Sequence, residues 1–322
     1  MAVEIEAPTL LGWPRFCYLL DSLRQWAATE GSDQMARQEA NSAQACPPHH
    51  WLITGLDHRG QHWSCLRCAA QRDLALDYVS AYVVAAKLLT KVGATDLAII
   101  AADRAATKAI EADSMIARGM AAYQVVCALS RADLSDQAEH LAVGMAEQVQ
   151  RDVRADKQSA VSVAGSLWLI ASVIAARRMD RDEAWARLDR AEYLAGLLGH
   201  DGNYAWTAFG PANVALHRVS VATEMGDAAE AVRAASGVDI TNFPEGLKSR
   251  RAQLHLDLAW AQAQRRRDAE AILHLIEAEH VAPEAVRYNV IVRELVREML
   301  TRAGRTQTSS LTDLAVRAGV LD

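Results

Sequence analysis

Lysine, phenylalanine and long hydrophobic runs are all scarce in this sequence of 322 residues. Lysine accounts for five of the 34 basic residues, and phenylalanine occurs three times. The scarcity of phenylalanine, together with abundant alanine, favours close helix–helix contacts over a core of bulky side chains. The longest apolar stretches, such as residues 166–176, fall short of the ~20 residues that a membrane span requires. The sequence therefore predicts no membrane protein.

Charge and the amino terminus restrict the functional class further. The formal net charge is −6, which excludes a general attraction to nucleic acid or to anionic membranes. The first nine residues are acidic and lack the basic start and apolar run of a signal peptide, so we expect a cytoplasmic protein. No phosphate loop, nucleotide-binding glycine pattern or nucleophile elbow occurs, so we expect binding and no enzymatic activity.

The sequence changes character near Asp73. Residues 1–73 are irregular and rich in Trp, His, Cys and Pro, whereas helical periodicity runs through most of residues 74–322. In the stretch 74–89, apolar residues recur every three or four positions, which predicts an amphipathic helix. A break at Gly93 and a second helix over 96–110 follow. We therefore expect an N-terminal segment and a separate helical domain.

The unit of helix, break and helix recurs five times. Each break has a small or polar turn, then an acidic residue near the helix start, then an alanine. These alanines are Ala98, Ala138, Ala184, Ala231 and Ala271. Their spacing of 40, 46, 47 and 40 residues exceeds the ~34 of a standard tetratricopeptide repeat. The pattern predicts an all-α fold, a tetratricopeptide-like α-solenoid of about five helix pairs. Terminal helices are expected over 286–302 and 311–320.

From about Asp73 onward the chain resembles the C-terminal tetratricopeptide-like domain of actinobacterial Xre-type transcriptional regulators. The residues that carry the resemblance are 203–219, continuing to 224–227, with support from 85–93, 282–288 and 292–296. The resemblance implies a regulatory sensor. In that family a helix-turn-helix domain normally precedes the repeats, but residues 1–72 lack its pattern. The stretch 311–320 resembles half of a helix-turn-helix, although its position after the last repeat predicts a capping helix.

A cluster of Cys and His residues indicates a structural Zn²⁺ site within residues 46–68. Cys46-x-x-His49 and Cys65-x-x-Cys68 form two short ligand pairs separated by a loop, as structural zinc sites require. The segment is also similar to a His-His-Trp…Cys-x-x-Cys element of small phage and plasmid proteins. That similarity favours His50 as the third ligand, whereas spacing favours His49, and both remain open. The alternative is a surface loop with reduced thiols and solvated histidines.

The best ligand-site candidates lie in the stretch 206–217. Trp206, Thr207, Asn213 and His217 stand within or beside an otherwise apolar helix, and the last two share a face because they are four residues apart. On the concave side of a superhelix, Asn213 would hydrogen-bond a peptide backbone. The alternative is that Asn213 and His217 join neighbouring helices or cap a turn.

Three functions follow as hypotheses. The first is a sensor that binds a peptide, small molecule or protein partner in the groove of its repeats. The second is a zinc-stapled scaffold or adaptor for two proteins. The third is DNA binding through the zinc segment, which the charge of residues 1–73 disfavours because six arginines oppose eight acids. A homodimer is expected by analogy with other repeat domains.

Overall fold

The computed structural model describes residues 51–57, 60–151, 157–238, 248–304 and 307–321, with residues 51–67 described by their backbone. The chain divides into two compact units, Met1–Gln71 and Arg72–Asp322. The division falls inside α3 (Leu66–Val92), close to Asp73, where the sequence changes character.

The described part of the first unit contains a β-hairpin where the sequence analysis expects a loop. Strands β1 (Trp51–Asp57) and β2 (Gly60–Cys65) pair antiparallel, with Trp51 opposite Cys65. The loop prediction was wrong because it weighed the glycines of this segment and neglected its strand formers. Aromatic and β-branched residues such as Trp51, Ile53 and Trp63 favour extended chain.

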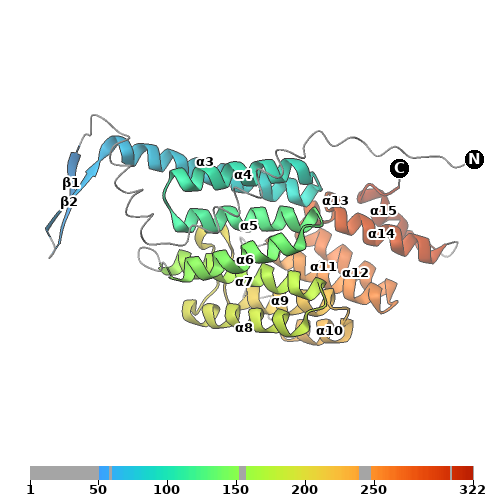
Figure 1. Ribbon diagram of the computed structural model, residues 1–322. Coiled ribbons are helices and arrows are strands. Elements are labelled where there is room, and N and C mark those ends of the chain that lie inside the picture. Colours follow the sequence, from blue (N-terminus) through green and yellow to red (C-terminus); the bar gives the residue numbers. More distant parts are fainter. Residues whose placement is uncertain (1–50, 58–59, 152–156, 239–247, 305–306, 322) are drawn as a thin grey trace, which may run out of the picture. The chain divides into compact units, whose positions relative to one another are not determined.

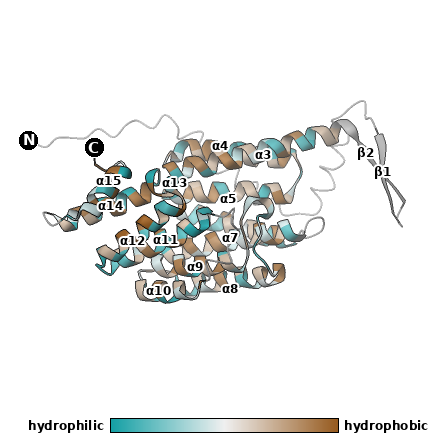
Figure 2. Ribbon diagram, turned by 180° about the vertical axis from the view of Figure 1, so that it is seen from behind, coloured by the Kyte–Doolittle hydropathy of each residue, from teal (hydrophilic) through white to brown (hydrophobic). Residues whose placement is uncertain are grey.

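Every element that the structure describes after Cys65 is helical, which confirms the all-α prediction for this part of the chain (Figure 1). The helices that follow α3 are α4 (Thr95–Glu111), α5 (Met115–Arg131), α6 (Ser135–Arg151), α7 (Lys157–Arg177), α8 (Arg181–Leu198), η1 (Tyr204–Trp206), α9 (Pro211–Glu224), α10 (Ala228–Ser236), α11 (Lys248–Gln264), α12 (Asp268–Val281), α13 (Pro283–Arg287), α14 (Val290–Ala303) and α15 (Ser309–Arg317). Brown apolar and teal polar stretches alternate along these helices in Figure 2, as expected for helices with one buried face.

The five breaks predicted from sequence share one turn geometry. In each, a residue with positive φ ends the first helix; these residues are Gly93, Asp133, Met179, Gly226 and Arg266. The N–H of the next residue then donates to the carbonyl oxygen five positions back, over 2.9–3.1 Å. This is the Schellman arrangement that closes a helix at a left-handed residue. In four breaks that next residue is also the N-cap of the second helix, and the Asp180 and Asp227 carboxylates accept backbone N–H groups there.

The alanine that follows each turn lies at a helix–helix contact. Ala98, Ala138, Ala184, Ala231 and Ala271 are all fully buried. A methyl side chain at these positions lets the second helix of each pair approach the first closely. The sequence prediction of an anchoring alanine at each break is therefore confirmed.

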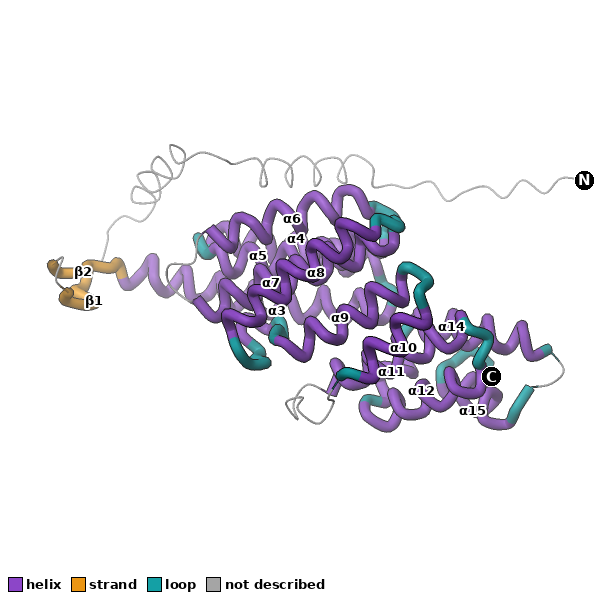
Figure 3. The backbone as a smooth tube through the Cα atoms, turned by 90° about the horizontal axis from the view of Figure 1, so that it is seen from below, coloured by secondary structure: helices purple, strands orange, loops and turns teal. Residues whose placement is uncertain are grey.

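Packing in the second unit links neighbours along the chain and also links alternate helices. Within α4–α8 and α9–α12, each helix contacts the next, and contacts also join α5 to α7, α7 to α9 and α9 to α11 (Figures 1 and 3). The turn after α3 reaches the start of α14, where a Cβ added to Gly93 would lie 3.6 Å from the Val290 side chain. The first and last parts of the helical array therefore meet.

Two predicted elements differ in detail from the structure. The helix expected over 286–302 is divided at Tyr288, because the Asn289 side chain accepts the Ile291 N–H and caps a new helix, α14. The apolar stretch expected over 166–176 belongs to the longer helix α7, whose stretch Gln158–Arg177 has the length and composition of a membrane span. That stretch is 89% buried within the protein, which identifies α7 as a core helix.

The turn geometry predicts opposite effects for two glycine-to-alanine changes. Gly226 has φ of 72° and open space around its Cβ position, so Gly226→Ala should destabilise the domain by about 1 kcal/mol through backbone strain alone. Gly144 lies within α6, also in open space, and Gly144→Ala should stabilise by about 0.5–1 kcal/mol. Urea unfolding measures the change in unfolding free energy for each variant. Changes of the same sign in both variants would contradict the turn assignment.

Candidate functional site

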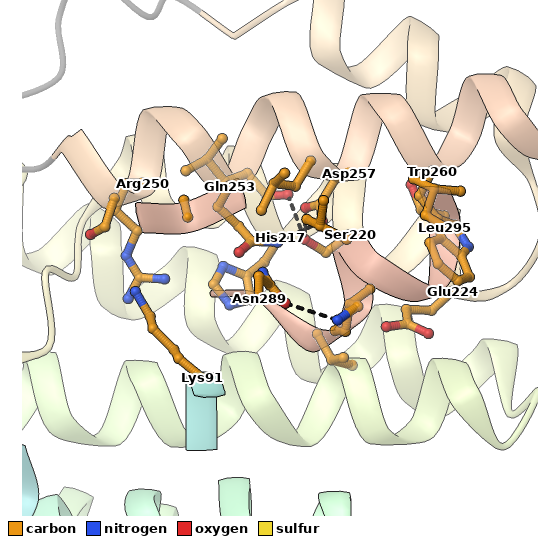
Figure 4. Close-up of a pocket in the computed structure, with 18 of the residues that line it drawn as sticks. Lys91, His217, Ser220, Glu224, Arg250, Gln253, Asp257, Trp260, Asn289 and Leu295 are labelled. Carbon is orange, nitrogen blue, oxygen red and sulfur yellow. Dashed lines mark hydrogen bonds between the residues drawn. The ribbon is translucent and has the colours of Figure 1, made fainter. Parts of the chain in front are cut away.

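A cavity of about 470 Å³ lies inside the second unit, a size typical of ligand pockets (Figure 4). Its wall combines side chains from the first helix pair with side chains from the last helices of the array. Lys91 comes from α3, Arg177 from α7, His217 from α9 and Arg250 from α11, and Asn289 precedes α14. The cavity is therefore a product of the closure of the array.

The loop before α9 fixes the N-terminal end of that helix. The Phe209 ring is fully buried and occupies the space beside Gly165 of α7, where an added Cβ would lie 2.1 Å from the ring. The Asp201 carboxylate accepts the N–H of Ala212 over 3.1 Å and so caps α9. These contacts fix the direction in which α9 begins.

Asn213 and His217 both line the cavity, as their shared helix face suggests. His217 Nδ1 lies 2.9 Å from the Asn213 carbonyl oxygen and must donate to it, which leaves Nε2 as an acceptor. Burial, followed by the Arg250 charge, lowers the pKa of His217 to about 4. The imidazole is therefore neutral at pH 7.

The Asn213 side chain is buried without a partner. The residue is 2% exposed, and neither Oδ1 nor Nδ2 has a hydrogen-bond partner in the described structure. An unpaired buried amide costs on the order of 1–3 kcal/mol in folding free energy. The alternative role of Asn213, to join helices or cap a turn, would give these atoms partners. The structure shows no such partner, and because both atoms lie beneath the cavity surface, a ligand pairs with them only after a neighbouring side chain moves.

Trp206 and Thr207 are not among the residues that line this cavity. Trp206 is 56% exposed, and the Thr207 hydroxyl donates to the Tyr204 carbonyl oxygen over 2.8 Å. Their backbone carbonyls accept from basic residues at or near the cavity, since Lys87 Nζ lies 3.4 Å from the Trp206 oxygen and Arg250 Nη2 of the cavity wall lies 3.1 Å from the Thr207 oxygen. The structure thus groups Asn213 with His217 and places the other two candidates in a supporting loop.

That supporting loop is strained. Ala205, Trp206 and Ala208 all have positive φ, between 48° and 60°. Left-handed backbone costs roughly 1 kcal/mol or more for each residue that has a Cβ. The loop keeps this conformation because Phe209 and Asp201 hold its far end and because Lys87 and Arg250 hold its carbonyls.

One end of the cavity is basic. Lys91 and Arg250 both line it, and in Figure 4 the Arg250 side chain extends toward Lys91. Desolvation, followed by the Arg250 charge, lowers the pKa of Lys91 and of Lys87 one helix turn before it. Both lysines remain accessible to solvent, and Lys91 lines the cavity whereas Lys87 lies beside it. A ligand that enters the cavity can therefore reach the Lys91 ammonium group.

A buried carboxyl group lies farther along the cavity. Burial raises the pKa of Asp257 to about 6, and the neighbouring Glu224 charge adds to the effect. Gln253 Nε2 donates to Asp257 Oδ1 over 2.8 Å, while Ser220 Oγ makes a short contact with Oδ2. Ser220 Oγ also lies 3.3 Å from the Leu216 carbonyl oxygen. The Ser220 and Gln253 donors favour the ionised carboxylate and so oppose the rise that burial causes in the Asp257 pKa.

The predicted metal ligands lie in the first unit. Cys46, His49 and His50 are outside the described residues, and only the backbone of Cys65 is described. Cys68 lies in the first turn of α3 and is half-buried. Among the residues that the structure does describe, no group of three His, Cys, Asp or Glu side chains could hold a metal ion.

Sequence analysis missed the charged part of the cavity. Lys87 and Lys91 carried a usable signal, because they are two of only five lysines and lie four residues apart on one helix face. Arg250 carries little signal, because arginines are frequent in this chain, and the structure places it on the cavity wall. Asp257 gave no signal, because nothing in its sequence neighbourhood marks it as buried among charged groups.

Comparison with known proteins adds no assignment. No family model matches the chain, and no curated protein matches it.

The raised pKa of Asp257 predicts a pH-dependent effect of Asp257→Asn. The folded protein keeps a proton that the unfolded chain loses between pH 3.8 and about 6, so wild-type stability is lost as pH rises through this window. Asparagine can replace the protonated acid in the Ser220–Gln253 chain at every pH. The variant should be close to wild type near pH 4 and exceed its unfolding free energy by about 3 kcal/mol above pH 6.5.

Urea unfolding of both proteins across this pH range is the measurement. The opposite pH dependence of His217 is common to both proteins and cancels in the difference. A difference that stays constant with pH would show that Asp257 titrates normally.

Proposed function

We propose that this chain is a non-enzymatic sensor whose helical repeats bind a peptide or other amide-bearing ligand in their internal cavity. The observation that carries the proposal is the buried, unpartnered Asn213 amide on the cavity wall. A side-chain amide offers one acceptor and two donors, which complement the N–H and C=O of a peptide group. The nearby His217 Nε2 offers a further acceptor for the ligand.

The repeated turns support a solenoid interpretation of the helical unit. Five pairs with the same left-handed turn residue, the same hydrogen bond and the same buried alanine behave as copies of one structural unit. Such arrays present a concave surface that is suited to extended ligands. Similarity to the tetratricopeptide-like domain of Xre-type regulators agrees with a regulatory role, in which ligand binding changes an interaction of the chain with a protein partner or with DNA.

A scaffold is the second candidate, because α3 exposes an apolar stripe. Leu74, Tyr78, Leu88 and Val92 are between 46% and 59% exposed, and Ala81 and Ala85 continue their alternating spacing of four and three residues. A heptad stripe of this kind accepts a second helix. A homodimer or a partner protein would cover it. A small ligand that stabilises the protein would favour the sensor, and the absence of such an effect would favour the scaffold.

The test of the sensor function compares two buried amides. Asn213 and Gln262 both have unpartnered buried polar atoms, but only Asn213 lines the cavity. Asn213→Leu and Gln262→Leu should each leave the ligand-free protein as stable as wild type or stabler by about 1–2 kcal/mol, since an unpaired polar group is removed. A pooled library of synthetic hexapeptides should raise the melting temperature of wild type and of Gln262→Leu.

Asn213→Leu should abolish that shift. Equal shifts in all three proteins would place peptide binding outside the cavity. No shift in any of them would favour the scaffold.

We also propose that the first unit holds a structural zinc ion. Trp51, the first residue of β1, pairs with Cys65, the last residue of β2. Cys68 follows Cys65 by three residues, in the first turn of α3. His49 and His50 immediately precede Trp51 in the sequence. Thiolate and imidazole ligands in this spacing suit a closed zinc site that stabilises a short hairpin.

Metal analysis of the purified chain tests the zinc proposal. We expect about one zinc ion per chain, lost in the double variant Cys65→Ser/Cys68→Ser, because four-ligand structural sites fail when two thiolates are removed. The matched control is Cys17→Ser/Cys127→Ser, which removes two cysteines outside the cluster and should retain the metal. Zinc-free wild-type protein would refute the module.

A further inference from the structure

The basic end of the cavity carries positive charge that the described residues do not balance. Among these residues, no acid forms an ion pair with Lys87, Lys91 or Arg250. Lys87 donates to the Trp206 carbonyl oxygen, and Arg250 donates to the Thr207 carbonyl oxygen and to the Tyr123 hydroxyl, all neutral groups. Arg250 lowers the pKa of both lysines, so the three cations repel one another. Glu284, which also lines the cavity, offsets part of this repulsion at Lys91.

These cations come from opposite ends of the helical array. Lys87 and Lys91 lie on α3, in the first pair, whereas Arg250 lies on α11, in the fifth. The ends are brought together by closure of the array, as the approach of Gly93 to Val290 also shows. The like charges of Lys91 on α3 and Arg250 on α11 repel each other. An anion bound between them would attract both helices.

The other charged groups of the cavity make its two ends different. The Arg177 guanidinium pairs with the Glu224 carboxylate over 2.6 Å, so that acid is already neutralised. Arg131 also lines the cavity, and the charges of Glu294 and Glu224 act on it, so this part of the wall carries charges of both signs. The net positive charge is greatest at the Lys91–Arg250 end, which favours that end for an anionic group of a ligand.

We propose that the ligand is a peptide with a free C-terminal carboxylate, and that Lys91 and Arg250 bind this carboxylate while Asn213 pairs with a backbone amide near it. This inference rests on the proposed function and specifies its ligand. Arg250 offers a planar pair of N–H groups and Lys91 a point charge, a combination that suits a carboxylate. His217 lies between Asn213 and the basic end, since its Nδ1 contacts the Asn213 carbonyl and its imidazole feels the Arg250 charge.

Binding would also change the structure of the array. The carboxylate replaces repulsion between the first and fifth pairs with attraction to both, so the ligand clamps the closure. In a solenoid, small changes at each contact between pairs add along the array. The clamp gives a physical route from ligand binding to an altered surface elsewhere on the second unit.

The test uses the full chain and the hexapeptide library made in two forms, with free C-terminal carboxylates and with C-terminal amides. Binding is measured by thermal shift and then by calorimetry on individual peptides that bind. We expect the amide form to bind at least about tenfold more weakly than the acid form, because a charge-assisted contact is lost. Lys91→Met and Arg250→Met should bind both forms equally, at the weaker level.

Lys248→Met is the matched control, because it removes a cation from the same helix as Arg250 at a residue that does not line the cavity. It should keep the preference for the acid form. Equal binding of acid and amide by wild type, lost in Asn213→Leu, would overturn the carboxylate site and leave the proposed function standing. Absence of binding in both forms would overturn both.

Inorganic phosphate and citrate are tested at matched concentration. Stabilisation by these ions through Lys91 and Arg250, with no response to any peptide, would show a site for small anions and would overturn the peptide assignment.

Discussion

Close approach between the two helices of each pair is the constraint on which this structure depends. A single left-handed residue reverses the chain, and the alanine in the first turns of the next helix is fully buried. A larger side chain at Ala138 or Ala231 would separate the helices and displace every later pair. Because the pairs stack in sequence, the position of α11 relative to α3 is the sum of these small distances. The cavity therefore depends on alanines that lie outside it.

The cavity contains several features that lower stability. Asn213 has an unpaired amide, Asp257 is a half-buried acid with a raised pKa, and the Lys91 and Arg250 cations repel each other. The loop before α9 adds strained backbone. Unpaired buried polar atoms also occur away from the cavity, as at Ser162, Ser166 and Gln262. The cavity differs in that an unpaired amide, a raised carboxyl pKa and repelling cations occur together there, which is the combination on which the proposed binding function rests.

The helical pairs could be predicted because their signals are local. Apolar spacing, turn residues and the anchoring alanines occur within a few positions of one another, so sequence periodicity locates each pair. Asn213 and His217 could be paired by helical spacing alone. Arg250 could not be assigned to the cavity, because Lys91, the cation that it faces, belongs to a helix at the other end of the array. The hairpin was missed because glycines at its turn were given more weight than the strand formers around them.

Side-chain amide resonances of Asn213 give the most direct measurement of the central claim, that this amide awaits a ligand. In the empty protein, the Nδ2 protons should resonate at positions typical of amides without a strong acceptor, with the assignment made by their loss in Asn213→Leu. Saturation with a bound free-acid peptide should shift them downfield and slow their exchange with water. Resonances already shifted and protected in the empty protein, and unchanged by a peptide that binds, would show that Asn213 is a structural residue and would contradict the account.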